Sequence, residues 1–495
     1  MIKPLLKLRA VAALTLLLGF KLSAAVYYID SVRGNDAWLG TALERPWKSL
    51  KRVNAQVFQA GDQMLFKAGT RYSGQLKPQG SGRFVDGKSE PIRLGRYGEG
   101  GDPRIDGEGK VLDTLLFRNV EFWDVADLEI TNLGKKRAPR RTGVRIVTDS
   151  FGTMRHIHLH NLFVHDVNGD LRKEREGCGI FFESRGWNRS HFEDLQIEHC
   201  HVVRTDRNGI CQRCGNRARS LGVVVRDNLL EDIGGDCIKL WGCNGGLVER
   251  NEVRGGRMRC DDSAAGIWPF DCDDTVIQFN EVSGMKGTED GQGFDADYLC
   301  RRSIFQYNYS HDNDGGFLLV CTPGDSYNED SVVRYNISQN DGIHSASVIH
   351  FGGSARHTCI YNNTIYVGTN QDLPLLKFTK WKDGSADDTK FFNNIFHVAG
   401  RVSYAWDKST RNIFDSNVFL GAHMTPPVDL HAMTNCPTLC APGTGGLGLD
   451  TLTGYKLKPN HEPQKGRLVA GNGGRDFFGR PVSRTGLPAV GAAEP

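Results

Sequence analysis

Residues 275–282 read TVIQFNEV, residues 303–310 read SIFQYNYS, and residues 331–338 read SVVRYNIS. In each segment apolar residues alternate with polar ones, an Asn follows, and a second alternating run begins. A period of two is typical of β-strands, because successive side chains of a strand point to opposite faces. The pattern recurs along the chain with its Asn residues at positions 228, 251, 280, 308, 336, 363, 394 and 417.

Weaker copies of the repeat lie upstream, with Asn161, Cys200 and Asp127 in the Asn position. A unit of roughly 20–30 residues predicts a solenoid in which each coil buries its apolar face against the next. Because the strands have a period of two, we expect a β-solenoid with parallel pairing. An Asn in the same position of every coil suits a left-handed bend, and stacked Asn side chains can form a hydrogen-bonded ladder.

The two ends of the chain lack the repeat and predict caps. We expect residues 26–109 to form an N-terminal cap and the first turns, with a short helix at 46–53 that begins near Pro46. Residues 110–420 should form the continuous solenoid. Residues 421–495 are rich in Gly and Pro, and we expect this irregular C-terminal cap to wrap the end of the solenoid.

Residues 1–25 are typical of a signal peptide. Lys3, Lys7 and Arg9 precede an apolar run, and small residues at 23–25 offer a cleavage site. Removing this segment, which holds four basic residues and no acidic one, changes the formal charge from +3 to −1. We therefore expect a secreted or periplasmic monomer with no nucleic-acid partner and no membrane span.

The chain has 13 cysteines, an odd number. Cys211 and Cys214 have C-x-x-C spacing, and Cys436 and Cys440 are also close in sequence. A second C-x-x-C with zinc spacing is missing, so buried thiols or local disulfides are favoured over a zinc site.

Several segments resemble secreted bacterial right-handed parallel β-helix proteins of the pectate-lyase-like superfamily. They are YYIDSVRGNDAWLGT at 27–41, PWKSLKRVN at 46–54, GDQMLFKAGTRYSG at 61–74 and NGGRDFFGRPV at 472–482, together with the Asn repeats. The resemblance implies an all-β, right-handed parallel β-helix. The superfamily contains polysaccharide lyases, glycoside hydrolases and epimerases, so the resemblance implies carbohydrate chemistry without choosing a reaction.

A second strand in each repeat, usually introduced by Gly, carries the candidate site. If its first apolar residue points inward, alternation turns other side chains outward, among them Asp295 and Asp297. Two carboxylates at i and i+2 have Cα atoms roughly 7 Å apart. Glycoside cleavage needs one carboxyl group as acid and another as base or nucleophile. A solvated outer face or a structural cation site is the alternative explanation of the pair.

The same outward column predicts substrate contacts near the pair. The aromatic ring of Trp268 would stack on a sugar, and Lys239 and Arg213 would hold an acidic substituent. Buried packing and a solvated set of turns are the alternatives. His350 continues the column. The loop with Glu289 and Asp290 would form one wall of a cleft, and Glu289 could assist catalysis.

Two further candidates lie in turns. Asp271 begins an Asp-rich turn at 271–274, which could supply a third catalytic carboxylate, bind Ca²⁺ or be an ordinary turn. His311 follows Asn308 and could contact substrate, although similar polar residues after other repeat Asn residues favour a structural turn.

These residues predict a secreted glycoside hydrolase that cleaves a polysaccharide or oligosaccharide, which could be anionic, with Asp295 and Asp297 as its acid and its base or nucleophile. The first alternative is a polysaccharide lyase, in which Lys239 removes a uronate proton while the Asp residues hold Ca²⁺. The second is a non-catalytic glycan-binding β-helix. For the hydrolase we expect no metal and no cofactor.

Overall fold

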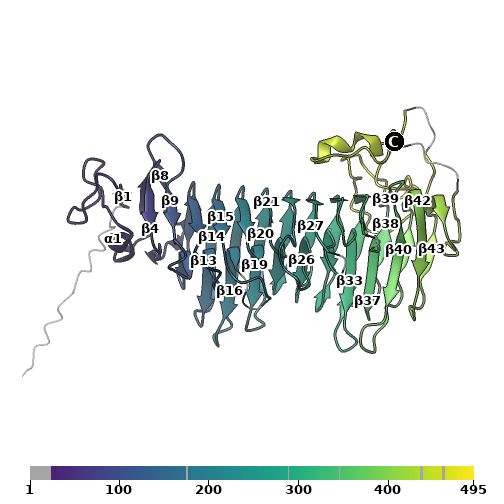
Figure 1. Cartoon of the computed structure of the whole chain (residues 1–495), viewed down its shortest axis with the longest axis horizontal. Helices are drawn as coiled ribbons and strands as arrows, with labels where there is room; N and C mark the ends of the chain where they lie inside the picture. The colour runs from purple at the N-terminus through teal and green to yellow at the C-terminus, as the bar shows by residue number, and fades with distance from the viewer. Residues whose placement is uncertain are drawn as a thin grey trace, which may run out of the picture.

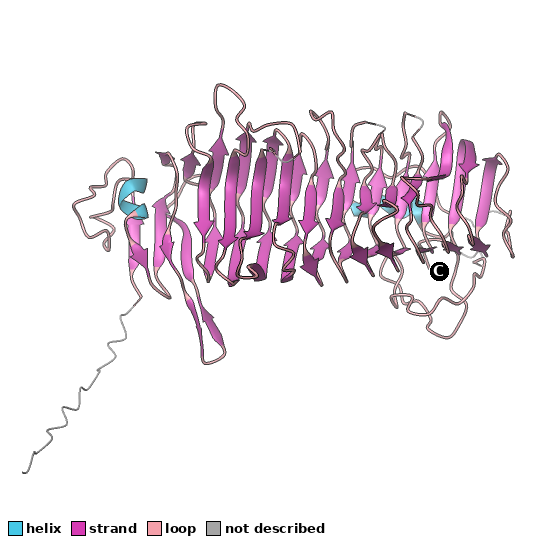
Figure 2. Cartoon of the chain, turned by 90° about the horizontal axis from the view of Figure 1, so that it is seen from below, coloured by secondary structure: helices cyan, strands magenta, loops and turns pink. Residues whose placement is uncertain are grey.

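The computed structural model describes residues 24–173, 175, 177–287, 289–344, 346–434, 439–459 and 463–495. They form a long rod of stacked coils (Figure 1), and the sheets that build the rod pair their strands in parallel. The predicted all-β parallel β-helix is therefore confirmed. One antiparallel hairpin, β6 (Arg83–Val85) with β7 (Lys88–Glu90), projects from the side of the rod (Figure 2). The predicted signal peptide falls on residues 1–23, which lie outside the described residues, and on Ala24 and Ala25.

Each complete coil contributes one strand to each of three faces, and coils at the two ends lack some of these strands. The first face leads into the Asn turn, the second face follows that turn, and a loop then leads to the third face. The strands of the first face are β1 (Val26–Ile29), β3 (Gln63–Lys67), β8 (Ile92–Tyr97), β11 (Trp123–Ala126), β14 (Thr153–His160), β17 (His191–Glu198), β20 (Ser220–Arg226), β24 (Leu247–Glu249), β27 (Val276–Gln278), β31 (Ile304–Gln306), β35 (Val332–Arg334), β38 (Cys359–Tyr361), β41 (Lys390–Phe392) and β43 (Ile413–Asp415), with β23 (Cys243–Asn244) beside β20.

The second and third faces are joined in one continuous sheet through the long strand β42 (Ile395–Ala405), which pairs with both. The second face consists of β4 (Arg71–Ser73), β9 (Arg104–Asp106), β12 (Glu129–Asn132), β15 (Phe163–Val167), β18 (His201–Thr205), β21 (Leu229–Glu231), β25 (Glu252–Arg254), β28 (Glu281–Ser283), β32 (Tyr309–His311), β36 (Ile337–Gln339), β39 (Thr364–Val367), β42 and β44 (Val418–His423). The third face consists of β10 (Asp113–Arg118), β13 (Thr142–Asp149), β16 (Cys178–Arg185), β19 (Asn208–Cys214), β22 (Ile238–Trp241), β26 (Ile267–Phe270), β29 (Phe294–Ala296), β33 (Leu318–Thr322), β37 (Ile349–Gly353) and β40 (Asp372–Thr379).

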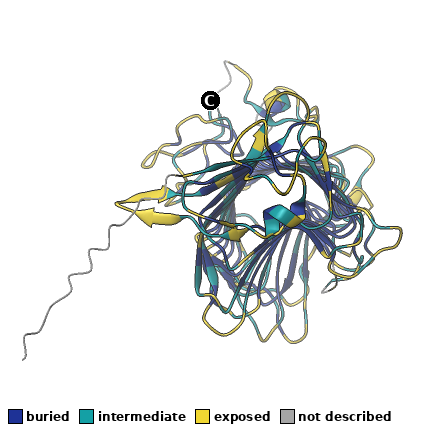
Figure 3. Cartoon of the chain, turned by 90° about the vertical axis from the view of Figure 1, so that its left-hand side faces the viewer, coloured by how far each residue is buried: buried dark blue, intermediate teal, exposed yellow. Residues whose placement is uncertain are grey.

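Short two-stranded pairings complete the sheets, namely β2 (Val57–Phe58) with β5 (Gln79–Gly80) and β30 (Cys300–Arg301) with β34 (Asn328–Glu329). The buried residues line the inside of the rod from end to end (Figure 3). Cys200, Cys237, Cys243, Cys272 and Cys300 are buried free thiols in this core. Cys436 lies outside the described residues. The preferred interpretation of these cysteines as buried thiols therefore fits the structure.

The repeat Asn residues form a continuous ladder between the first and second faces. The Asn280 side chain donates to Asn308 Oδ1 at 3.0 Å and to the Val248 carbonyl at 3.0 Å, while its own Oδ1 accepts from Asn251 Nδ2 at 2.9 Å. The same side-chain bonds link all eight predicted Asn residues, and Asn417 donates to Asp429 at 2.7 Å. Since these amides are buried, the ladder satisfies polar groups that would otherwise be costly inside the rod.

The left-handed bend lies one residue before the ladder, which corrects the prediction that the Asn itself adopts it. Phe279 and Tyr307, which precede Asn280 and Asn308, have φ of 56° and 58°. The ladder Asn must turn its side chain inward, so the residue before it takes the strained conformation. Asn161 has φ of 55° and is exposed, so it occupies the bend and not the ladder.

The N-terminal helix is shorter than predicted. Helix α1 spans Leu50–Asn54, and the Ser49 hydroxyl accepts a hydrogen bond from Arg52 N at 3.2 Å as its N-cap. Pro46 therefore lies before the helix and not at its first turn. Trp47 instead forms a bridge with Ile29 and packs in the core.

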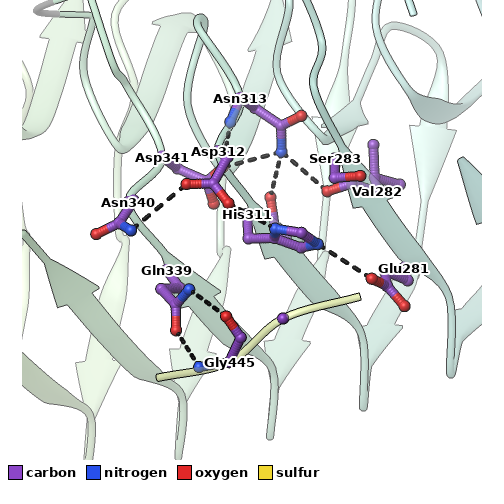
Figure 4. A network of polar contacts seen from close by, with 12 residues as sticks. Glu281, Val282, Ser283, His311, Asp312, Asn313, Gln339, Asn340, Asp341 and Gly445 are labelled. Atoms are coloured by element: carbon purple, nitrogen blue, oxygen red, sulfur yellow. Dashed lines mark hydrogen bonds and ion pairs between the residues drawn. The ribbon is translucent and has the colours of Figure 1, made fainter. Parts of the chain in front are cut away.

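The C-terminal residues do more than cover the end of the rod. Asp429 and Met433 bridge to the last coil, but the following segment runs back along the second face (Figure 1). Its 3₁₀ helix η1 (Leu449–Tyr455) lies beside β28, where Gly448 N donates to Glu281 at 2.9 Å. Just before this helix, Gly445 N donates to Gln339 of β36 at 2.8 Å (Figure 4). This segment covers an apolar patch of the second face and the neighbouring turns, which consists of Tyr307, Tyr309, Tyr335, Ile337, Tyr361 and Phe392.

None of the helices in the described part of the chain is long and apolar enough to cross a membrane.

We predict that Asn308→Ala lowers the free energy of unfolding by about 1–3 kcal/mol, because two buried donors of Asn280 lose their acceptor. Chemical denaturation measures the loss. Asn188→Ala, at an exposed position, is the matched control and should change the stability little. Equal stability of the two variants would contradict a stabilising role of the ladder.

Candidate active site

Four neighbouring strands of the third face form the floor of a pocket. Strand pairing places Lys239 beside Trp268 and Asp295 beside Leu319, in one outward column. A second column, two residues further along each strand, holds the side chains of Trp241, Phe270, Asp297 and Cys321. Loops between the second and third faces supply one wall, which includes Lys173, Ala264 and Asp290, and Trp381 lines the pocket from the turn after β40. The cavity has a volume of about 350 Å³.

Five of the eight residues predicted from the sequence line this pocket, namely Asp295, Asp297, Lys239, Trp268 and Arg213. Alternation along the strands brings them together, as expected. Asp271, His311 and His350 lie outside the pocket lining. Glu289 is exposed, whereas its neighbour Asp290 lines the pocket.

Asp295 and Asp297 lie close together around the thiol of Cys321. Cys321 Sγ is 3.7 Å from Asp295 Oδ1 and 3.4 Å from Asp297 Oδ1, and the three groups offer ligand atoms that all lie within 4.8 Å of one another. Asp295 is only 6% exposed, whereas Asp297 is half-buried and more accessible from the pocket. Asp297 also accepts a hydrogen bond from Tyr298 N at 2.7 Å.

Three carboxyl groups in the pocket have raised pKa values. Burial raises the pKa of Asp290 to about 7; the nearby Asp236 and Asp297 add to the rise, and Lys173 opposes it. Burial raises the pKa of Asp297 to about 6, against the hydrogen bonds from Tyr298 N and Cys321. Burial, with repulsion from Asp297 and Asp290, raises the pKa of Asp295 well above its ordinary range. At neutral pH the pocket therefore holds carboxyl groups in both protonation states.

Asp236 is a fourth acidic residue of the pocket, and it remains ionised. It is fully buried, and although burial opposes ionisation, the charges of Arg207, Lys239 and Lys173 hold its pKa below the ordinary value. Its Oδ2 accepts from Arg207 Nη1 at 3.1 Å, and its Oδ1 accepts from the indole of Trp268 at 3.1 Å. Asp236 therefore fixes the orientation of Trp268.

The cationic residues of the pocket pack against its aromatic rings. Lys239 Nζ lies 5.1 Å from the ring centre of Trp268 and 5.8 Å from that of Trp241, and the Arg213 guanidinium lies 5.9 Å from Trp241. Cations over the faces of indole rings are attracted by the ring electrons. Lys173 approaches the other side of the pocket, 5.7 Å from Trp268.

Trp381 lies at one edge of the pocket, and His350 packs against it. A Cβ atom on Gly352 would lie 2.4 Å from the Trp381 ring, so the missing side chain makes room for the indole. His350 contacts Trp381 edge to face with ring centres 5.9 Å apart and is hydrogen-bonded to Thr379 Oγ1 at 2.7 Å. Burial lowers the pKa of His350 to about 4. His350, which was predicted as a substrate contact, therefore lies behind Trp381 as a neutral ring and outside the pocket lining.

Asp271 is a structural turn residue in this protein. Its backbone has φ of 51°, and its carboxylate pairs with Arg219 at 2.9 Å. Arg219 also pairs with Asp273 at 2.6 Å. Asp271, predicted as a third catalytic carboxylate, therefore lies in an ion pair outside the pocket lining.

His311 lies on the second face under the C-terminal segment (Figure 4). It is 4% exposed, with Nε2 3.0 Å from Glu281 Oε1 and Nδ1 2.8 Å from Asp312 Oδ2. Burial alone would lower its pKa, but these two carboxylates outweigh burial and raise it to about 9. The charged His311 holds Glu281, which anchors Gly448. His311 was predicted to bind substrate, but its strand β32 belongs to the second face and not to the face that carries the pocket.

Asp236 was missed as a site residue in the sequence, whereas Asp290 was expected only as part of a loop that forms one wall of the cleft. Asp236 lies in the loop before β22, and Asp290 lies in the loop before β29, where alternation along a strand gives no information. A signal for Asp290 exists in the sequence, because Glu289 and Asp290 enter the strand of the Asp295 pair.

The carboxylates of the pocket are a poor Ca²⁺ site. Calcium prefers six to eight oxygen ligands, but the third group beside Asp295 and Asp297 is the soft thiol of Cys321. The oxygens of Asp236 are already hydrogen-bonded to Arg207, Trp268 and Ala265 N. The donor set gives no support to the calcium-assisted alternative.

A parallel β-helix with carboxyl groups, aromatic rings and cations in a pocket on one face is the architecture of carbohydrate-active β-helix proteins. No protein-family model matches the chain. Over 83% of its length the chain is 29% identical to a lacto-N-biosidase of Bifidobacterium longum subsp. longum, of which it spans 31%. The chain thus spans about a third of the length of this curated relative.

Solved structures give the same relationship. The native GH136 lacto-N-biosidase from Eubacterium ramulus aligns with a TM-score of 0.63 and 27% identity, over 73% of this chain and 66% of that chain. The complex of XylC with xylose aligns with a TM-score of 0.53 and 11% identity, over 94% and 98% of the two chains. The second likeness shows the fold alone.

We predict that Asp295→Asn raises the melting temperature at neutral pH. Because burial raises the pKa of this acid, the folded state loses stability as pH rises from the unfolded pKa of about 3.9 toward the folded value. The neutral amide removes this penalty, so the gain should shrink as pH is lowered toward 4. Thermal unfolding at several pH values measures it, and a loss of stability at neutral pH would contradict the raised pKa.

Proposed function

We propose that this chain is a glycoside hydrolase that cleaves an oligosaccharide in the third-face pocket. The observation that carries the proposal is the set of Asp290, Asp295 and Asp297 in one cavity, with two pKa values near neutrality. Glycoside hydrolysis needs a protonated acid for the leaving oxygen and an ionised carboxylate as base or nucleophile, and such tuning provides both at one pH.

Accessibility separates the roles of the three groups. Asp290 and Asp297 are half-buried in the pocket, so both can touch substrate, whereas Asp295 lies deeper. Asp290, with a pKa of about 7, serves as the general acid. Asp297, with the lower pKa and two hydrogen-bond donors, serves as the base or nucleophile. Asp295 stays protonated, so it adds no second negative charge beside Asp297.

The other lining residues position the sugars. Trp268, fixed by Asp236, and Trp381, seated on Gly352, offer aromatic surfaces for sugar rings at two sides of the pocket. Lys173, Lys239 and Arg213 offer hydrogen-bond donors to hydroxyl or acidic groups. The two lacto-N-biosidase relatives make a substrate of lacto-N-biosidases the first to test.

The pocket is also better suited to a glycoside hydrolase than to a polysaccharide lyase or to a protein that only binds glycans. In a lyase, Lys239 would have to act as a base, but it faces the ionised Asp236, whose charge favours the protonated amine. A protein that only binds glycans gains nothing from burying three mutually repelling carboxyl groups. We also propose that the protein is exported, because residues 1–25 are typical of a signal peptide, and the mass of the mature chain tests whether this segment is removed.

We predict that Asp290→Asn and Asp297→Asn each lower kcat/KM on the oligosaccharide by about 10²–10⁴-fold. With a nitrophenyl glycoside of the same sugar, whose leaving group needs little protonation, Asp290→Asn should recover most of its activity and Asp297→Asn should not. Asp271→Asn, outside the pocket, is the matched control and should keep its activity.

Product analysis separates the candidate functions in the same assay. New reducing ends without ultraviolet-absorbing unsaturated sugars support hydrolysis, whereas unsaturated products would establish the lyase. Wild-type turnover by folded Asp290→Asn and Asp297→Asn variants would rule out the proposed catalytic pair.

We predict a bell-shaped dependence of kcat/KM on pH, with its maximum between about 6 and 7. Activity should fall below pH 6 as Asp297 becomes protonated, and above pH 7 as Asp290 loses its proton. In Asp290→Asn, assayed on the nitrophenyl glycoside, the alkaline limb should disappear while the acidic limb remains. If the alkaline limb persists in this variant, a group other than Asp290 donates the proton to the leaving oxygen.

A further inference from the structure

A cluster of two His and two Asp residues lies on the first face of the rod, on a different face from the pocket. Asp124 comes from β11, His156 and His158 come from β14, and Asp194 comes from β17. His156 Nδ1 lies 2.9 Å from Asp194 Oδ2, and His158 Nε2 lies 3.0 Å from Asp194 Oδ1. His156 Nε2 lies 3.2 Å from Asp124 Oδ1, and His158 Nδ1 lies 3.7 Å from the same oxygen.

A left-handed kink shared by neighbouring strands creates the cluster. In β14 both Met154 and Ile157 point into the core, so two residues between them must point outward. His156 takes the extra position with φ of 51°, and Asp194 takes the equivalent position of β17 with φ of 59°, so the two strands stay in register. The kink therefore brings His156 and His158 to the same side, with their ring centres 3.9 Å apart.

The donor atoms are close enough to share one ion. Asp124, His156 and His158 offer ligand atoms that all lie within 4.8 Å of one another, and Asp194 contacts both imidazoles. Zinc binds His nitrogen and carboxylate oxygen at about 2.0–2.2 Å, so Asp124, His156 Nε2 and His158 Nδ1 can supply three ligands to one ion. Asp194 faces the opposite nitrogens of both imidazoles and would orient the two rings from outside the ion. Gln196 Nε2 donates to Asp194 Oδ1 at 2.7 Å and orients this carboxylate from outside the cluster.

We propose that Asp124, His156 and His158 bind one divalent transition-metal ion of the zinc class, with Asp194 holding the two imidazoles in place. Two imidazoles select such an ion over Ca²⁺ and Mg²⁺, which prefer oxygen ligands alone. The three ligands come from two successive coils and Asp194 from the next, so the ion and its hydrogen-bonded carboxylate link three coils where the chain leaves the N-terminal turns. The catalytic step in the pocket does not involve this ion.

The side chains of the cluster are partly exposed, so an ion can reach them from solvent. The side chains of His156 and His158 are 14% and 22% exposed, and those of Asp124 and Asp194 are 27% and 46% exposed. A hollow of about 630 Å³ beside the cluster is lined by Phe84 of the projecting hairpin, by Glu121 and Phe122 before β11, and by residues of β14 and β17, including His156 and Asp194. The ion would therefore have a path from solvent and room for a water ligand.

The test titrates the purified full chain, first stripped of metal with a chelator, with zinc chloride. We expect one zinc ion per chain after dialysis and a higher melting temperature, and we expect calcium chloride to reproduce neither effect. Cobalt chloride should give the visible absorption of a cobalt ion bound to His ligands. These readouts are independent of glycoside hydrolysis, so the proposal can fail while the proposed function holds, and the reverse.

Single substitutions test which residues hold the zinc ion. His158→Ala and Asp194→Asn should each weaken zinc binding at least about tenfold and abolish the thermal shift. His160→Ala, two residues further on the same strand and outside the cluster, is the matched control and should bind zinc as the wild type does. Circular dichroism confirms that each variant is folded; a destabilised His158→Ala is replaced by His158→Gln. Absence of stoichiometric zinc, or zinc binding unaffected by these variants, overturns the proposal.

Discussion

Stacking of one coil on the next is the constraint on which the whole molecule depends. Each coil can bury its apolar side chains and satisfy its backbone only if its neighbours keep the same register. The Asn ladder enforces this register at one corner, because each amide must meet its neighbour within hydrogen-bond distance. A one-residue slip in any coil would break the ladder and turn the outward columns of the third face inward. The active-site geometry therefore depends on an interaction at a different corner of the rod.

The pocket uses the rigidity of that frame to hold like charges together. Asp290, Asp295 and Asp297 repel one another and are partly removed from water, which is unfavourable for folding. The regular strands fix two of them, and a loop fixes the third. Asp236, neutralised by Arg207 and hydrogen-bonded to Trp268, shows how the same pocket keeps one carboxylate ionised. Burial and pairing thus give four chemically identical side chains different charges.

Most of the fold could be predicted from the sequence, because a period of two and a recurring Asn report directly on strand direction and coil length. The strand positions of the site followed for the same reason: Asp295, Asp297, Lys239 and Trp268 share a face by alternation. Loop residues followed less well, since Asp236 and Asp290 reach the pocket through turns of irregular length; Asp236 was not expected at all, and Asp290 only as part of a cleft wall. His311 and Asp271 lie outside the pocket, which the sequence could not show, because their polar neighbours look the same whether they serve a turn or a substrate. The His cluster has a signal, His at 156, 158 and 160 on one strand, but the left-handed kink that makes it a cluster is a tertiary feature.

The return of the C-terminal segment along the second face affects the order in which the chain can fold. Gly448 meets Glu281 across 167 residues, and Asn362 meets Gly491 across 129 residues. Coils form between segments that are close in sequence and can add one after another during synthesis. The last segment instead has its partners on the coils between Glu281 and Asn393, which must form first. Until it docks, the tyrosine-rich patch stays open to solvent and to other chains. The final residues therefore cover this patch only late in folding. A nascent chain that stalls before they are made would expose the patch, which could then aggregate or bind chaperones.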